Sequence, residues 1–207
     1  MSNYEKMQNQ MASVFLAYDQ DAMIRRFGLK ADKEALIFDF LGGGCRIDRS
    51  TGAVLCKTAA DRDFRTADYN EAMTVYDLLC YAKPGAIPSG RMMNMASLCK
   101  RYGALPGRQP SFFKPEAKRF DAETDRLAAA LAALGAAVNV SGEIKAEIPV
   151  LDTLVMRFHF CPSDEEFPPE IQFFWDEAVP DFMHYETVWF ANHALIRRLT
   201  DLMHRGI

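Results

Sequence analysis

Hydrophobic residues recur at helical spacing at both ends of the chain. Near the N-terminus the pattern covers two segments. The second of these, residues 21–27, is followed by Gly28, a residue suited to the left-handed conformation that closes helices. Near the C-terminus, apolar residues line one side of residues 187–205. The sequence therefore predicts helices at its N- and C-terminal ends.

Shorter apolar runs in the first third of the chain predict a meander of three strands. Residues 35–41 are apolar on both faces and precede three glycines, as expected for a buried strand that ends in a turn. Residues 45–48 and 53–57 flank a loop that contains Gly52, whose freedom to adopt a positive φ angle suits a hairpin.

The register of this hairpin decides whether two cysteines meet. With an even number of loop residues Cys45 lies opposite Cys56, whereas with a three-residue loop Arg46 lies opposite Cys56. The sequence leaves both registers open. We expect these thiols to be structural, because no feature of the sequence explains a lowered thiol pKa.

The middle of the chain predicts helices on both sides of an irregular segment. Asp68 and Glu71 have the spacing of a capping box, and apolar residues follow at helical intervals. Between residues 83 and 120 five prolines prevent a long helix, so that only residues 92–102 are expected to form a short one. Residues 121–134, rich in Ala and Leu and followed by glycine, predict a further helix.

Two segments in the last third alternate between apolar and polar residues, the pattern of half-buried strands. One is residues 151–161, and the other is residues 171–175. The link between them, residues 162–169, is acidic and rich in proline, so we expect the two strands to pair antiparallel across a long loop. The apolar positions place four aromatic residues in the core: Phe158, Phe160, Phe173 and Trp175.

Strands that come in runs, separated from the helices, indicate an α+β fold with an antiparallel or mixed sheet flanked by helices. The 207 residues are 49% hydrophobic and 25% charged, which is typical of a soluble globular protein and allows one domain over residues 1–207. No run of about 18 apolar residues is present, so a membrane protein is not expected.

Charge is unevenly distributed along the chain. The net charge of -4 argues against a nucleic-acid coat or a polybasic membrane binder. Residues 83–120, the basic segment, carry eight basic residues against one acid, which leaves 16 basic and 27 acidic residues elsewhere. With Phe112 and Phe113 nearby, the segment predicts an anion-binding site formed by four residues: Arg91, Lys100, Arg101 and Arg108. The alternative is that the segment offsets the protein's own acids.

The five cysteines predict neither a metal site nor a disulfide framework. They are odd in number, widely spaced and contain no C-x-x-C pair, which is typical of reduced thiols in the cytoplasm. The sequence also lacks the glycine-rich phosphate loop, the dinucleotide fingerprint and the nucleophile elbow. We therefore expect no metal and no cofactor.

One further set of residues resembles a catalytic group. Arg157 and His159 share a strand face, and pairing with the next strand would bring Glu170 near them, so that a carboxylate could tune a general base. The alternative is the solvated side of an amphipathic sheet. The leading hypothesis is thus a cytosolic, non-enzymatic binding or accessory protein whose basic segment contacts an anionic ligand or an acidic protein partner. The rival hypothesis is an enzyme that acts on an anionic small molecule at Arg157, His159 and Glu170.

Several short motifs resemble a family of prokaryotic proteins, frequent in anaerobes, known as domain of unknown function 3786. The motifs occur in order at residues 40–42, 79–81, 89–90 and 148–150, and the most distinctive is the acidic, proline-containing stretch at residues 164–169 with Phe173 and Asp176 downstream. The family has no assigned activity. Some members resemble fusions to a cysteine-rich iron–sulfur segment, and this chain departs from them because its cysteines are not clustered.

Overall fold

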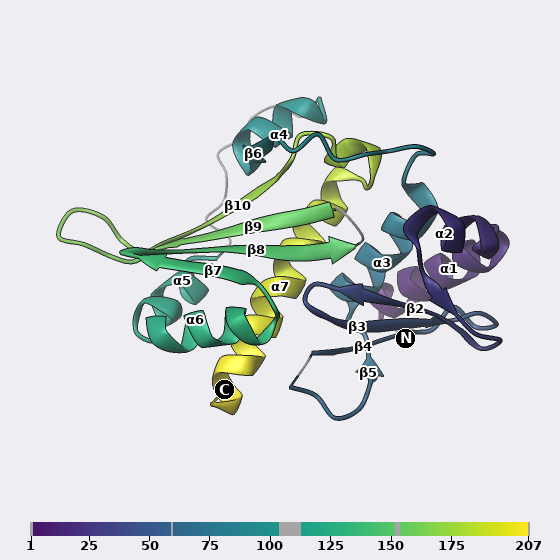
Figure 1. Ribbon diagram of the computed structural model, residues 1–207, viewed down its shortest axis with the longest axis horizontal. Coiled ribbons are helices and arrows are strands. Elements are labelled where there is room, and N and C mark those ends of the chain that lie inside the picture. Colours follow the sequence, from purple (N-terminus) through teal and green to yellow (C-terminus); the bar gives the residue numbers. More distant parts are fainter. Residues whose placement is uncertain (1, 59, 104–112, 152–153, 207) are drawn as a thin grey trace.

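Two antiparallel sheets lie side by side in the computed structural model, which describes residues 2–58, 60–103, 113–151 and 154–206 (Figure 1). The N-terminal sheet has the order β1-β2-β3-β4-β5, with the bounds Lys30–Ala31, Ala35–Phe40, Gly43–Asp48, Val54–Thr58 and Arg65–Thr66. The C-terminal sheet has the order β6-β10-β9-β8-β7, with β6 to β10 at Met92–Asn94, Ala137–Ser141, Glu143–Leu151, Leu154–Cys161 and Glu170–Asp176. The predicted α+β class is confirmed, with two sheets where one was expected.

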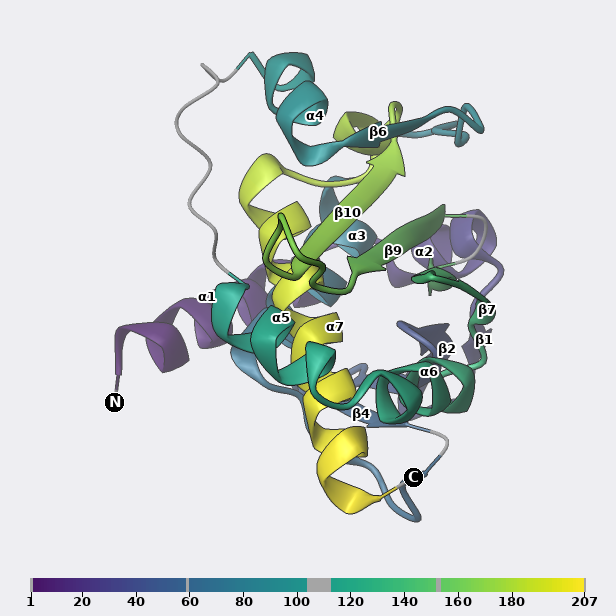
Figure 2. The same ribbon diagram turned by 90° about the vertical axis from the view of Figure 1, so that its left-hand side faces the viewer.

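Helices precede, link and follow the sheets. They are α1 (Asn3–Ala17), α2 (Gln20–Phe27), α3 (Tyr69–Tyr81), α4 (Met95–Arg101), α5 (Lys114–Asp121), α6 (Thr124–Ala133), the 3-10 turn η1 (Val179–Asp181) and α7 (Tyr185–Arg205). The long helix α7 passes behind the C-terminal sheet and then beside α6, and the two views agree on this placement (Figures 1 and 2). Within the described ranges, no helix combines the length and the apolar character needed to cross a membrane.

The hairpin of β3 and β4 settles the register that the sequence left open. Cys45 lies opposite Cys56, and their sulfur atoms are 3.3 Å apart. Both thiols are fully buried, and burial raises the pKa of the Cys45 thiol well above its usual range. This supports structural cysteines rather than reactive ones.

The run of glycines before this hairpin is only partly a turn. Gly42 has a φ of +69°, and a Cβ atom there would lie 2.1 Å from the carbonyl oxygen of Leu134, so glycine is required. Gly43 and Gly44 instead begin β3. The expected turn is therefore shorter, and the strand longer, than the composition indicated.

The pairing of β9 with β10 is the one that the alternation predicted. Phe158 lies opposite Phe173, and both are buried on the face covered by the helices. The indole nitrogen of Trp175 donates a hydrogen bond to Asn192 of α7 at 3.0 Å, which ties β10 to the long helix. The four predicted aromatic residues are all in the core. Register follows from alternation because a shift by one residue would expose all of them.

Two expected helix boundaries were wrong, and the strand β7 was missed. Residues 92–102 divide into β6 and α4. The side chain of Asn94 accepts the backbone N–H of Ser97 and so caps the helix, which begins at Met95. The helix expected at 121–134 begins at Thr124, after α5 has ended at Asp121. The strand β7 was not predicted, since its residues are mostly exposed and carry little hydrophobic pattern.

A buried ion cluster joins the N-terminal sheet to helices α3 and α7. The carboxylate of Glu71 accepts hydrogen bonds from Arg65 at 2.7 and 2.9 Å and from Arg198 at 2.9 Å. Arg198 also donates to the carbonyl oxygens of Phe40 and Leu41 at 2.7 and 2.9 Å. Glu71 and Arg198 are each 1% exposed, so the cluster compensates charges that water does not reach.

Candidate functional site

The residues of the predicted anion site have different surroundings in the structure. Arg91, which precedes β6, donates to Glu177 at 2.8 Å from its Nε atom. Lys100 and Arg101 are exposed at the end of α4, and Arg108 lies outside the described residues. Arg91 therefore offsets an acid of its own protein. Anion binding by Lys100 and Arg101 stays a prediction.

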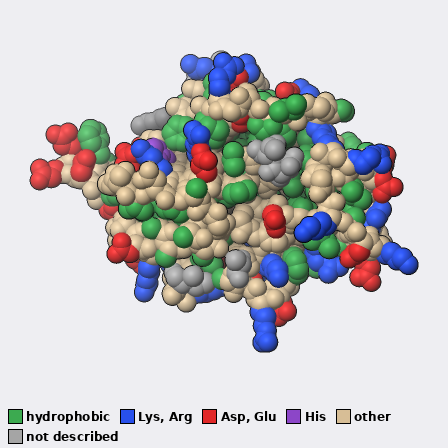
Figure 3. Space-filling view, in the orientation of Figure 1, with side chains coloured by type: hydrophobic (Ala, Val, Ile, Leu, Met, Phe, Trp, Pro, Cys, Tyr) green, Lys and Arg blue, Asp and Glu red, His purple; other side chains and the backbone are tan. Residues whose placement is uncertain are grey.

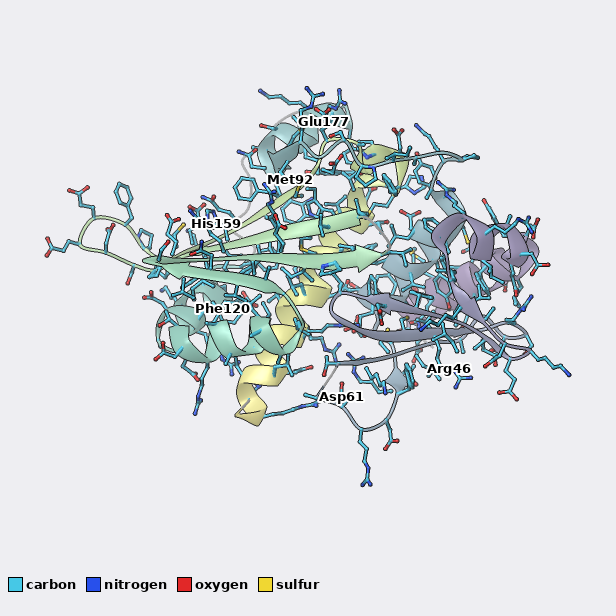
Figure 4. All side chains as sticks on the ribbon, in the orientation of Figure 1. Arg46, Asp61, Met92, Phe120, His159 and Glu177 are labelled. Carbon is cyan, nitrogen blue, oxygen red and sulfur yellow. The ribbon has the colours of Figure 1, made fainter. Side chains whose placement is uncertain are left out.

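The predicted catalytic residues lie on the face of the C-terminal sheet that is turned away from α5 and α6. Figure 4 shows His159 above the strands and Phe120 of α5 beneath them. In the register of β9 and β10, Gln172 lies opposite His159, and Glu170 lies opposite Cys161. Arg157, His159 and Glu170 are thus on one face of the sheet. Glu170 does not lie directly opposite His159 but two residues along β10 from the residue that does.

His159 and Arg157 line a cavity of about 470 Å³ over this face, together with Lys145 and Glu147. Arg157 donates to Glu147 at 2.7 Å. The Nε2 atom of His159 is buried without a hydrogen-bond partner among the described residues, and Glu143 is 3.5 Å away. Glu170 lines a different cavity, so no histidine–carboxylate pair is assembled with it.

We expect an NMR titration of His159 to give a pKa below the ordinary value of about 6.5. Burial disfavours the charged ring, and nearby Lys145 adds to the effect, while Glu143 opposes it. The unfolded chain then binds the proton more readily, so this residue makes the protein less stable as the pH falls from about 6.5 toward the folded pKa. Lys145→Gln should raise the measured pKa. A His159 pKa above 6.5 would contradict the placement.

A second cavity lies along β10, and we call it the β10 groove. It encloses about 730 Å³ between β10, the start of α4, the start of α5 and the loop at 162–169. Four aromatic side chains contribute to its lining: Phe113, Phe167, Phe173 and Trp189. Phe113 packs edge to face on Phe173, with ring centres 5.4 Å apart. A groove of this size and character is typical of binding sites for small molecules and side chains.

One wall of the β10 groove comes from the basic segment. Its contributions are Asn94, Met95, Ala96, Phe113, Lys114 and Ala117. The sequence drew attention to the segment through its charge and its paired phenylalanines, and Phe113 and Lys114 do line the groove. Trp189 was missed, because on α7 it follows the helical pattern of the core and carries no separate signal.

The loop at 162–169 forms the opposite wall, and hydrogen bonds stabilise both its base and its tip. At its base, Ser163 donates to Asp121 of α5 from its backbone nitrogen at 2.9 Å and its hydroxyl at 2.6 Å. At its tip, Asp164 accepts the backbone N–H groups of Glu166 and Phe167 at 2.8 and 2.7 Å. Phe167 is nevertheless 65% exposed. Figure 3 shows the loop as a projection on the left, where acidic side chains adjoin apolar ones.

The far end of β10 is fixed by Asp176. Its carboxylate accepts the backbone N–H groups of Ser89 and Gly90 at 2.9 and 2.7 Å, across 87 and 86 residues of sequence. These bonds bring β6 alongside β10, where Met92 and Glu177 are labelled in Figure 4. Strand β10 links three of the motifs on which the family resemblance rests. Residues 164–169 precede the strand, Asp176 ends it, and residues 89–90 bind Asp176.

Comparison with known protein families shows to which family the chain belongs. The sequence model of the family described as Domain of unknown function (DUF3786) matches residues 19–198. The chain belongs to this family. Neither the curated proteins nor the solved structures contain a significant match.

The family motifs have distinct places in this DUF3786 protein. Residues 40–42 supply the carbonyl oxygens that Arg198 binds, and Tyr81 packs against His184 with ring centres 3.7 Å apart. These motifs stabilise the fold, whereas residues 164–169 border the β10 groove. Within the described ranges, no group of three or more His, Cys, Asp or Glu residues is arranged to hold a metal ion.

Proposed function

We propose that this DUF3786 protein is a non-enzymatic binding protein that holds its ligand in the β10 groove. The observation that carries the proposal is the groove itself, about 730 Å³ in volume, with four aromatic residues in its lining and walls formed by the basic segment and the loop at 162–169. A cytoplasmic location is part of the proposal, supported by the odd number of widely spaced cysteines.

The polar groups of the groove support binding rather than catalysis. Hydrogen bonds from the N–H groups of Phe167 and Glu166 lower the pKa of Asp164, which makes it a weak base. Glu170 accepts a hydrogen bond from Gln172 at 2.9 Å. Both carboxylates are thus engaged in holding the local structure, as expected for a wall of a binding site.

The chain's two tryptophans allow a direct test of the proposal. Trp189 lines the β10 groove, whereas Trp175 is fully buried. With 5-fluorotryptophan in both positions, we expect benzyl compounds to move the ¹⁹F resonance of Trp189 and to leave that of Trp175 unchanged. The probes are benzylamine, benzyl alcohol and phenylacetate, which share one ring and differ in charge.

A matched variant identifies the binding site. Ala96 is exposed at the groove wall, so Ala96→Tyr should fill the groove without disturbing the core and should abolish the shift of the Trp189 resonance. No shift with any probe, or an equal shift in Ala96→Tyr, would contradict the proposal. The phenylacetate arm also tests the expected contact of the basic segment with an anion, since Lys114 lines the groove.

A second function has one observation in its favour. The His159 ring lines the 470 Å³ cavity beside Arg157 and Lys145, and its buried Nε2 atom has no hydrogen-bond partner in the described part of the chain, so the ring is a candidate general base for an anionic substrate. In that case the protein is an enzyme acting on an anionic small molecule. Chemical-shift changes of His159 and Arg157 on adding phosphate or citrate, lost in Arg157→Gln, would support this alternative.

A further inference from the structure

Strand β6 covers only part of the outer edge of β10. Its register runs from Asp176 opposite Met92 to Phe174 opposite Asn94, where the chain turns into α4. The β10 residues from Glu170 to Phe173 have no register partner on that side within the described ranges. The antiparallel pairing with β6 thus stops half-way along β10, and we call the remaining part of this side the open edge.

The backbone groups that face this open edge can be identified. The N–H of Glu177 donates to the carbonyl oxygen of Arg91 at 2.8 Å, so odd-numbered residues of β10 direct their N–H and C=O groups toward β6. Even-numbered residues, such as Gln172, direct theirs toward β9. Ile171 therefore presents both its N–H and its C=O at the open edge. An unpaired edge of this kind is a template for another strand.

The β10 groove lies along the same edge. In an antiparallel pair, residues directly opposite each other point to the same face. A side chain opposite Ile171 would thus point to the face of Ile171 and Phe173, where Phe113 and Trp189 line the groove. A groove beside a free edge combines the two requirements of strand addition, which are main-chain hydrogen bonds and a pocket for alternate side chains.

Charge indicates the kind of partner. The charged residues that line the groove are Asp164 and Glu170 against Lys114, and the adjoining Glu165 and Glu166 are exposed. Acids therefore outnumber bases on this rim, so positively charged residues in the partner are favoured.

We propose that the β10 groove binds an extended polypeptide segment of a partner protein, which adds to the open edge of β10 antiparallel and in line with β6. The segment places a large apolar or aromatic side chain opposite Ile171, with basic residues beside it. This inference rests on the proposed function, because it names the ligand class of the same groove.

The test uses a fluorescein-labelled peptide, Val-Lys-Phe-Lys-Val, followed by fluorescence anisotropy on the full-length protein. The central Phe supplies the anchor, and the two Lys residues face the acidic rim. We expect binding to weaken at least about tenfold when Phe is replaced by Ala, and to weaken similarly when both Lys are replaced by Glu. A Glu-containing peptide that binds more tightly than the Lys-containing one would overturn the inferred partner charge.

Backbone N-methylation separates strand addition from docking of side chains alone. Methylation of the Phe nitrogen removes the N–H that bonds to the Ile171 carbonyl and should weaken binding at least about tenfold. Methylation of the following Lys nitrogen, which points away from β10, should leave the affinity within about threefold. Equal affinities for the two methylated peptides would overturn strand addition.

Variants of β10 test the same geometry from the protein side. Ile171→Pro removes the N–H at the open edge and keeps the ladder to β9, so it should fold and lose peptide affinity. Ile171→Ala keeps that N–H and should still bind. Gln172→Pro should instead lower the thermal midpoint, because its N–H faces β9. Comparable unfolding of Ile171→Pro and Gln172→Pro would overturn the assignment of the open edge.

The outcomes distinguish this inference from the proposed function. If the benzyl probes shift the Trp189 resonance and the peptide does not bind, strand addition is wrong and the binding function stands. If both fail, the β10 groove is not a binding site and both proposals are wrong.

Discussion

Replacing Glu71 by Gln is expected to lower the free energy of unfolding by about 3–5 kcal/mol, because it leaves the buried guanidinium of Arg198 without its compensating charge. Glu71 also accepts the N–H of Asp68 at 3.0 Å, as the second half of a capping box, and the amide oxygen of Gln can still accept that bond, so the loss reports on the missing charge. Urea denaturation followed by circular dichroism measures the loss.

The control for this variant is Glu186→Gln, an exposed residue in the first turn of α7, for which the change should stay within about 0.5 kcal/mol. A loss below about 1 kcal/mol in Glu71→Gln would show that the cluster is not the buried ion site described. The double variant with Arg198→Met should cost less than the sum of the two single variants, because the two side chains compensate each other.

The same cluster predicts a pH dependence. Burial acts to raise the pKa of Glu71, but Arg65 and Arg198 outweigh it, so the folded pKa lies below the ordinary value of 4.5. The stability that Glu71 contributes is therefore complete above the ordinary pKa and is lost as the pH falls through the folded pKa. In Glu71→Gln this part of the acid dependence should be absent.

Replacing Phe158 by Ala is expected to lower the free energy of unfolding by about 3–5 kcal/mol. The ring is 1% exposed and packs edge to face on Phe173, with centres 5.7 Å apart, so truncation removes contacts from both strands and leaves a cavity. Chemical denaturation of Phe167→Ala provides a control of identical chemistry. Phe167 is 65% exposed, and its truncation should change stability by about 0.5 kcal/mol at most. Similar losses in the two variants would contradict the placement of Phe158.

Local patterns were sufficient to predict those parts of the fold that neighbouring residues determine. The alternation around Phe158 and Phe173 predicted both the pairing and the buried face, and the capping box of Asp68 and Glu71 predicted the start of α3. The cysteine register remained open because it depends on one residue of loop length. The loop between Asp48 and Ala53 places Cys45 opposite Cys56.

The parts that were not predicted depend on contacts between distant segments. The capping box identified Glu71 as a local cap, but its bond to Arg198 spans 127 residues. Likewise β6 forms beside β10 because Asp176 holds residues 89–90, a contact that no local pattern reveals. The β10 groove is built from three such segments, so the sequence indicated the basic segment as a candidate without showing what it faces.

Hydrogen–deuterium exchange with and without the Val-Lys-Phe-Lys-Val peptide tests the central claim, that the β10 groove of this DUF3786 protein binds an extended peptide by strand addition to β10. The other edge of the same sheet, β7, is an internal comparison because it is an edge strand without the aromatic groove. The account predicts slower exchange in residues 169–176 on adding peptide and unchanged exchange in residues 137–141. Protection of residues 137–141 instead, or unchanged exchange throughout the C-terminal sheet, would contradict it.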